Sequence, residues 1–140
     1  MTILNDTAEY AVRAALYVAQ HGSRERPARA QEIATALGIP RNYLSKIMHT
    51  YVSSGVLSSI TGPQGGFWLA IPPAKLPLTR LVEPFDPVQP RRTCVLGRAE
   101  CSDRNPCPAH GRWKGISDDV ARFFRATTVA DLLDEPGSLV

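Results

Sequence analysis

The middle of the chain passes from two helical patterns into a short hairpin, and this order constrains the fold more than any other feature. Apolar residues at helical spacing predict helices over Ala30–Leu37 and Pro40–Ser53, separated by a turn that contains Gly38. The segments Val56–Ile60 and Phe67–Ile71 are typical of strands, and a glycine-rich turn joins them. A helix pair with a short turn, followed by a glycine-tipped hairpin, predicts a winged helix-turn-helix, whereas the pair alone would also fit an ordinary helical bundle.

Helical patterns also occupy both ends of the chain. Asp6 and Glu9 are spaced as a capping box at the start of a first helix, which Gly22 is expected to end. Near the C-terminus an apolar stripe predicts a long helix, and Thr127 or Thr128 is expected to cap a final short one. The predicted fold class is mainly α with a small β-hairpin: a winged helix-turn-helix plus a long C-terminal dimerisation helix.

Composition divides the chain into four parts. Residues 1–71 carry the winged helix-turn-helix, and residues 72–92 form a proline-rich linker with one short helix. Residues 93–110 are a cluster loop with all three cysteines, and residues 111–140 hold the dimerisation helix and the short C-terminal helix. We see no export signal and no uninterrupted apolar segment of membrane-spanning length, so we expect a cytoplasmic protein with no membrane partner and with reduced cysteines.

Charge favours DNA as the partner of the predicted winged helix. The formal net charge is +3, the pI is near 9.0, and no acidic residue occurs from Ile33 to Val82. A recognition helix and a wing that approach phosphates should lack carboxylates, because DNA would repel them. The predicted DNA contacts are Arg41, Asn42, Tyr43, Ser45, Lys46, Gly65 and Gly66. The two glycines would let the wing backbone come close to DNA. The alternatives are solvated surface charge for Arg41 and Lys46, and core packing for Tyr43.

The cysteines form a second pattern. Cys94, Cys101, Cys107 and His110 follow C-x6-C-x5-C-x2-H in a polar loop that offers no hydrophobic reason for cysteine. Thiolates and imidazole are ligands for zinc and for iron–sulfur clusters. The spacings are wide for the knuckles of zinc sites and suit a loop around a larger inorganic core, with zinc, unliganded thiols and a surface role for His110 as alternatives. No catalytic nucleophile–base pair, phosphate loop or carboxylate pair is found, so the sequence predicts no enzyme.

The C-terminal stripe is strongly apolar for a chain whose first domain already has a core. It comprises Trp113, Ile116, Val120, Phe123 and Phe124. Such a face is costly to expose, and a second copy of the chain would bury it. The stripe is therefore the predicted dimer interface, with packing against the chain's own winged helix as the alternative.

Short motifs carry a family resemblance from about Thr7 to Leu133. They are Glu9-Tyr10-Ala11-Val12-Arg13-Ala14, Glu32-Ile33-Ala34, Asn42-Tyr43-Leu44, Gly62-Pro63-Gln64-Gly65-Gly66-Phe67-Trp68-Leu69-Ala70, the three cysteines, and Thr128-Val129-Ala130-Asp131-Leu132. Each is weak alone, but in this order they resemble the Rrf2 family of bacterial transcription regulators, and in particular its iron–sulfur members of the IscR and NsrR type.

The resemblance implies a homodimer that binds a partly palindromic double-stranded DNA operator and crosses its long C-terminal helices. It also implies an iron–sulfur cluster beside the dimer interface, of the 2Fe–2S type in preference to 4Fe–4S, whose state changes the affinity for DNA. Cys94, Cys101 and Cys107 would be ligands. The fourth would be His110, which we favour, or Glu9 of the partner subunit. The implied function is a regulator, in most cases a repressor, that senses redox state, nitric oxide or cluster supply.

Two positions depart from the family pattern. Thr61 stands before the wing glycine where relatives commonly have arginine, which implies a different wing contact and a different operator. The gap between Cys94 and Cys101 holds six residues where IscR-like chains often have five. The alternative function is a zinc-stabilised or a cluster-free, thiol-based regulator of the same fold.

Overall fold

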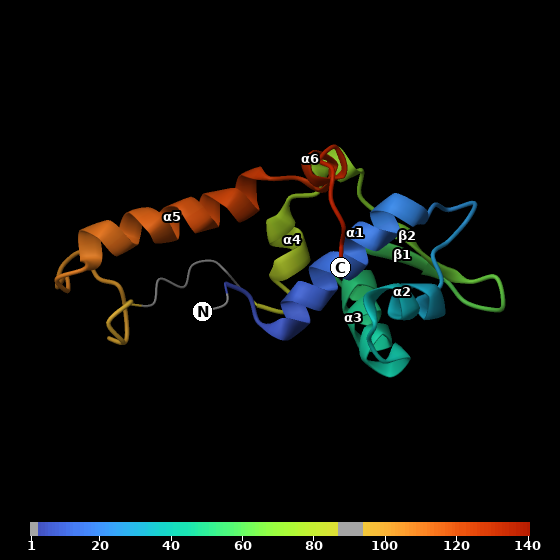
Figure 1. The fold of residues 1–140 in the computed structure, drawn as a ribbon, viewed down its shortest axis with the longest axis horizontal. Helices are drawn as coiled ribbons and strands as arrows, with labels where there is room; N and C mark the ends of the chain where they lie inside the picture. The colour runs from blue at the N-terminus through green and yellow to red at the C-terminus, as the bar shows by residue number, and fades with distance from the viewer. Residues whose placement is uncertain (1–2, 87–93) are drawn as a thin grey trace.

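The computed structural model describes residues 3–86 and 94–140, and it confirms the mainly helical fold with one hairpin (Figure 1). The elements are α1 (Asp6–His21), α2 (Ala30–Leu37), α3 (Arg41–Ser53), β1 (Leu57–Ile60), β2 (Gly66–Leu69), η1 (Pro73–Lys75), α4 (Leu78–Val82), α5 (His110–Ala126) and α6 (Val129–Leu133). Helices α1 to α4 gather around the hairpin, and α5 extends away from them. Within the described residues, no helix has both the length and the apolar character needed to cross a membrane.

Helix α1 begins at Asp6, as the sequence predicts, but its cap is Asn5 rather than Asp6. Asn5 is extended, and its side-chain oxygen accepts a 2.8 Å hydrogen bond from the amide of Ala8. The Asn5 amide donates to Asp86 Oδ2 at 2.8 Å, which ties the helix start to the segment after α4. Asp6 is therefore already the first helical residue, and it cannot form the predicted capping box with Glu9.

The turn between α2 and α3 follows the prediction closely. Gly38 has a φ of 68°, a left-handed conformation that glycine adopts without steric cost. Pro40 is the N-cap of α3, so the helix begins one residue later than expected. Both helices bury one apolar face beside α1. The buried residues of the two helices are Ile33, Ala34, Leu37, Leu44, Ile47, Met48 and Tyr51.

The wing is an antiparallel hairpin that the segment before α2 extends. β1 pairs with β2 so that Leu57 lies opposite Leu69. Ala28 and Phe67 exchange two backbone hydrogen bonds of 2.9 and 2.8 Å, which fasten the start of α2 to the wing. The wing and the helix pair are thus held together by the backbone itself.

Both wing glycines have a reason inside the fold, in addition to the predicted approach to DNA. A Cβ on Gly65 would collide with the carbonyl of Ile60, and a Cβ on Gly66 would collide with the carbonyl of Ala28. Gly65 is half-buried, and Gly66 is buried. Close packing within the hairpin for Gly65, and against Ala28 for Gly66, therefore requires glycine at these two positions whether or not the wing approaches DNA.

The segment predicted as a linker is part of the core as far as Val82. It contains η1 and α4 instead of one short helix, and Leu76, Leu81 and Val82 are fully buried. The Tyr51 hydroxyl donates a 2.8 Å hydrogen bond to the Leu81 carbonyl, which joins α3 to α4. The last part of the predicted linker and the first residue of the predicted cluster loop, residues 87–93, lie outside the described residues.

Helix α5 packs against α4 through its C-terminal half, where Ala121 and Phe124 are buried. Its N-terminal half carries the cysteine loop and projects beyond the other helices (Figure 1). Thr128 caps α6, as the sequence predicts, and exchanges hydrogen bonds of 3.2 and 2.9 Å with Asp131. The chain therefore places the cysteine loop at one end of the molecule and the helix-turn-helix at the other.

Candidate DNA-binding surface and cysteine loop

A groove of about 500 Å³ lies between helix α3 and the wing. None of the described residues that line it is acidic. The predicted DNA contacts in its lining are Arg41, Ser45, Gly65 and Gly66, and Asn42 and Lys46 are exposed on the same helix. Its charged wall residues are cationic, and the rest are neutral polar or apolar, so the groove suits the phosphate backbone of DNA, which a carboxylate would repel.

Tyr43, also predicted as a DNA contact, is half-buried and held from inside the chain. Its hydroxyl oxygen lies 2.7 Å from Thr7 Oγ1 in the first turn of α1. Its ring meets Tyr10 edge to face, with the ring centroids 6.0 Å apart. The hydroxyl thus already has a hydrogen-bond partner, which favours the alternative role of core packing for this residue.

Arg29 lines the same groove, although the sequence analysis did not single it out. Its guanidinium Nη2 donates a 2.7 Å hydrogen bond to Gln64 Oε1 in the wing turn. Its backbone amide donates to Glu32 Oε1 at 2.6 Å, which caps the start of α2. The only available signal was its basic character, because its approach to Gln64 depends on the fold.

The four predicted metal ligands lie in two close pairs. Cys94 Sγ and Cys107 Sγ are 3.6 Å apart, and Cys101 Sγ lies 3.3 Å from Nδ1 of His110. All three cysteines are free thiols. Among residues 3–86 and 94–140, no three histidine, cysteine or acidic side chains converge as they would around a single metal ion. The donors are thus arranged two by two.

His110 is held in place by Asp103, a residue that no sequence pattern singles out. His110 is buried at the first position of α5, and its Nε2 lies 2.7 Å from Asp103 Oδ1. Lys114 Nζ lies 3.1 Å from the same oxygen. The hydrogen bond with His110, followed by that from Lys114, lowers the pKa of the Asp103 carboxyl. An ionised Asp103 accepts the proton of Nε2, which leaves the Nδ1 lone pair directed at Cys101.

The Cys94 thiol has an environment that favours its ionised form. Hydrogen bonds from the backbone amides of Arg98 and Leu96 lower the pKa of Cys94, and the neighbouring Cys107 thiol acts in the same direction. A lowered pKa increases the thiolate fraction at neutral pH, and thiolate is the form that ligates metals and attacks oxidants. Cys94 is also buried, so the lowered pKa marks it as a ligand candidate rather than as a thiol open to solvent.

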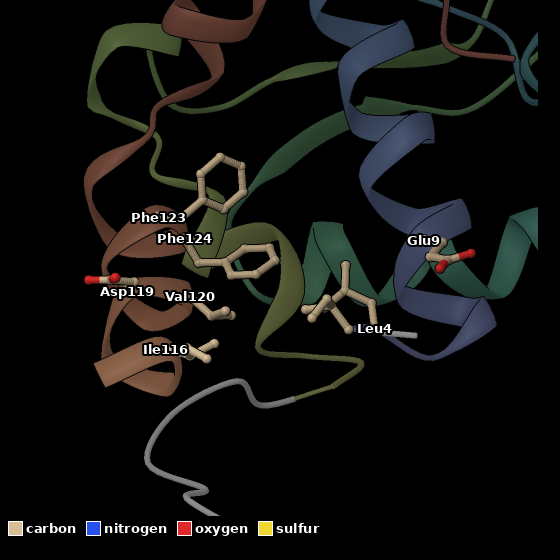
Figure 2. A pocket seen from close by; sticks show the side chains of 8 residues that line it. Leu4, Glu9, Ile116, Asp119, Val120, Phe123 and Phe124 are labelled. Carbon is tan, nitrogen blue, oxygen red and sulfur yellow. The ribbon is translucent and has the colours of Figure 1, made fainter. Parts of the chain in front are cut away.

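Glu9, the alternative fourth ligand, lies in neither pair of the same chain. It is exposed on α1 and lines an apolar groove of about 640 Å³ between the N-terminal segment and α5 (Figure 2). Figure 2 shows Ile116, Val120 and Phe124 on α5 directed toward Leu4, with Glu9 beyond it on α1. Any contact of Glu9 with a cysteine loop would have to come from a second chain.

The apolar stripe of α5 is divided between the chain's own core and the surface. Ile116 and Phe123 are 57% and 51% exposed, and Trp113 and Val120 are half-buried. Phe124 is only 7% exposed and packs in the core, which corrects its assignment to the dimer interface. Phe123 and Phe124 meet edge to face with centroids 5.1 Å apart. The Phe123 ring is half exposed, whereas the Phe124 ring is buried in the core.

Residues 4–135 match the Rrf2 family, described as "Iron-dependent Transcriptional regulator". The chain belongs to the Rrf2 family. This Rrf2 protein is 37% identical over 134 residues to a "Putative HTH-type transcriptional regulator" of Aquifex aeolicus, a match that covers 94% of this chain and 92% of that one. It is 28% identical over 137 residues to the HTH-type transcriptional regulator IscR of Serratia proteamaculans, which covers 98% and 82% of the two chains.

Solved structures share the fold of this Rrf2 protein. CymR of B. subtilis, the global cysteine regulator, superposes with a TM-score of 0.80 at 21% identity and covers 98% of this chain and 100% of its own. IscR of T. potens superposes with a TM-score of 0.69 at 20% identity and covers 96% and 93%. The chain is thus a winged-helix transcriptional regulator of the Rrf2 family.

Proposed function

We propose that this Rrf2 regulator is a homodimer that binds operator DNA through α3 and the wing and holds an iron–sulfur cluster in its cysteine loop. We further propose that it acts in the cytoplasm, as a repressor whose affinity for DNA follows redox state, nitric oxide or cluster supply. The observation that carries the cluster is the pairing of Cys94 with Cys107 and of Cys101 with His110.

The distances within each pair fit two ligands of one tetrahedral metal ion. Two sulfurs bound at about 2.3 Å to one tetrahedral metal lie about 3.8 Å apart, and one such sulfur and a nitrogen at about 2.0 Å lie about 3.5 Å apart. The sulfurs of Cys94 and Cys107 are 3.6 Å apart, and the donors of Cys101 and His110 are 3.3 Å apart. A 2Fe–2S cluster takes two protein ligands on each iron, whereas a 4Fe–4S cluster takes one ligand on each of four irons. The pairs therefore favour 2Fe–2S.

The side chains around the pairs support the same assignment. Asp103 orients the imidazole of His110, and Lys114 holds Asp103. Such a carboxylate behind a ligating histidine fixes its tautomer and strengthens it as a donor. A cluster bound there would supply a redox couple and iron–sulfide bonds that oxidants and nitric oxide attack.

The position of His110 connects the loop with the proposed dimer. His110 is the first residue of α5, and the exposed Ile116 lies further along the same helix. We propose that a second α5 covers the groove lined by Ile116, Val120 and Phe123. The conformation of the cysteine loop, which leads into α5, would then determine how the two subunits are oriented relative to each other. The spacing of the two α3 helices would follow, because each α5 packs against its own α4.

Selection of bound sequences from random duplex DNA tests this function. The cluster-loaded protein, purified without oxygen, and the chelator-stripped protein would be used in parallel. We expect a partly palindromic sequence whose affinity differs between the two forms. The absence of any selected sequence would overturn DNA binding, and equal affinities of both forms would overturn control by the cluster.

A cluster-free thiol switch is the second candidate, and the Cys94–Cys107 pair favours it as well. The two sulfurs are 3.6 Å apart, and the more exposed Cys107 would meet a peroxide first. One hydrogen peroxide would take two electrons and two protons from the two thiols, leaving a disulfide and two waters. A zinc-stabilised protein is less supported, because the donors of the described residues do not surround one point. The iron, sulfide and zinc contents of the anaerobically purified protein distinguish the iron–sulfur protein, the thiol switch and the zinc-stabilised protein.

A further inference from the structure

We infer that Arg29 is a DNA contact that binds a backbone phosphate beside the wing, with Gln64 holding its guanidinium in position. The inference rests on the DNA-binding surface proposed above and extends it to a residue outside the helix-turn-helix and the hairpin. It concerns the path of the DNA over the wing, which the α3 contacts alone do not determine.

Arg29 is hydrogen-bonded both to α2 and to the wing turn. Its backbone is extended, and its amide is bonded to Glu32 Oε1, so the main chain is fixed at the start of α2. Its guanidinium reaches across to Gln64 Oε1 at 2.7 Å. Gln64 is neutral, so this bond orients the guanidinium without cancelling its charge. The planar group retains further N–H donors in the fork geometry that matches phosphate oxygens.

Arg29 lies between two hollows of different charge. On one side it lines the groove between α3 and the wing together with Arg41 and His49, where the described lining residues include no carboxylate. On the other side Arg29 and Gln64 line a second hollow with Glu25 and Glu32, so the side open to an anion is the one that faces α3. Arg29 is exposed, so the charge is accessible to a macromolecule. A DNA duplex seated on α3 would therefore meet cations from both α3 and the start of α2.

The wing itself lacks a cation at its turn. The residues from Thr61 to Gly65 are threonine, glycine, proline, glutamine and glycine. Arg29 is the cation that a hydrogen bond attaches to this turn, through Gln64. We assign it to phosphate rather than to a base edge, because one side of the guanidinium is already engaged in the wing and the residue lies at the flank of α3. Phosphate contacts position a protein on DNA without reading sequence.

The salt dependence of binding tests the inference. The full-length protein would be titrated by fluorescence anisotropy on its selected operator and on a scrambled duplex, over a range of salt concentrations. The variants are Arg29→Ala, Arg29→Lys and Gln64→Ala, with Arg26→Ala as a control because Arg26 is exposed nearby but does not line the α3 groove. Thermal melting confirms that each variant is folded.

Arg29→Ala should weaken binding to both duplexes by the same factor. It should also reduce the slope of log K against log salt by about 0.9 for each chain bound, which is about 1.8 for a dimer. Arg29→Lys should keep the slope, and Gln64→Ala should keep it with a smaller loss of affinity. An unchanged slope in Arg29→Ala would overturn the phosphate contact and leave Arg29 as a support for the wing. A loss confined to the operator would overturn it in favour of a base contact. Failure of the wild-type protein to bind either duplex would instead refute the DNA-binding surface itself.

Discussion

The Tyr43 hydroxyl oxygen lies 2.7 Å from Thr7 Oγ1, so the first turn of α1 holds the N-terminal end of the recognition helix α3. The Tyr43 ring meets Tyr10 edge to face, and the Arg13 guanidinium carbon lies 4.6 Å from the centroid of the Tyr10 ring. Glu9, on the same stretch of α1, lines the apolar groove beside α5. The start of α1 therefore joins the proposed dimer groove to the proposed DNA-binding helix.

Removing either hydroxyl of this contact should have nearly the same effect as removing both. We expect Tyr43→Phe and Thr7→Val each to lower the free energy of unfolding by about 0.5–1.5 kcal/mol. The double variant should lose little more than one of them, because the second change removes no further bond. Urea denaturation of the four proteins measures the coupling, and strictly additive losses would show that the contact contributes nothing.

Arg41 should contribute to sequence recognition, because it is exposed at the start of α3 and lines the groove. We expect Arg41→Ala to weaken operator binding by about 1–3 kcal/mol if the guanidinium makes a bidentate base contact. Mobility-shift titrations on the operator and on a scrambled duplex measure the loss. An equal loss on both duplexes would make Arg41 a phosphate contact, and no loss would remove it from the interface.

The helix-turn-helix could be predicted because its signals are local. Apolar spacing and the left-handed conformation of Gly38 depend on neighbouring residues only. The cap of α1 could not be predicted in the same way, since Asn5 is fixed by Asp86, which lies 81 residues away. The prolines after residue 71 similarly suggested a linker, but the burial of Leu76 and Leu81 depends on packing against distant helices.

Ile116 and Phe124, which lie about two turns apart on α5, should respond differently to substitution. Ile116→Asp puts a charge on the exposed part of the stripe, so it should shift the protein toward monomer and weaken operator binding. Phe124→Ala should instead lower the free energy of unfolding by about 3–5 kcal/mol, because Phe124 belongs to the core. Analytical ultracentrifugation and urea denaturation separate the two effects. Arg125→Asp, on another face of α5, is the control for added charge.

An intact dimer in Ile116→Asp would contradict the proposed interface. A Phe124→Ala protein of unchanged stability would contradict the core assignment of that ring.

The buried hydroxyl of Tyr51 should make the folded protein less stable at alkaline pH. Burial raises the pKa of its hydroxyl well above the ordinary value of about 10. Above that pH the unfolded chain loses the tyrosine proton while the folded chain keeps it, so the free energy of unfolding falls as pH rises. Tyr51→Phe loses the hydrogen bond to the Leu81 carbonyl, at a cost of about 1–3 kcal/mol near neutral pH, but it also loses this pH dependence. The difference between the two proteins should therefore narrow above about pH 10. Urea denaturation across this range measures it, and a constant difference would contradict the assignment.

The sequence predicts four ligands in the cysteine loop but could not show which of these side chains lie together. The spacing C-x6-C-x5-C-x2-H contains no information that Cys94 meets Cys107 across the loop. Asp103 was missed because a single carboxylate in a polar loop has no distinguishing pattern. Phe124 was placed in the interface because helical spacing cannot tell which of two adjacent rings turns inward. These features depend on the path of the backbone, which local patterns do not specify.

The identity of the fourth ligand distinguishes a cluster site formed by one chain from a site that includes Glu9 of the partner subunit. We expect His110→Ala to lose or change the cluster spectrum after anaerobic reconstitution. Glu9→Ala should keep the wild-type absorption and circular dichroism, because Glu9 belongs to neither donor pair. The reverse outcome would assign the ligand to the partner.

The Mössbauer spectrum of the anaerobically purified wild-type protein tests the central claim most directly. One iron with two thiolates and one with a thiolate and an imidazole are chemically different, so the two donor pairs predict about two irons per chain in two quadrupole doublets of equal area. The same measurement on His110→Ala should show the second doublet lost or displaced and the first unchanged. A single doublet in the wild-type protein, four irons per cluster, or a spectrum that His110→Ala leaves unaltered would contradict the paired site.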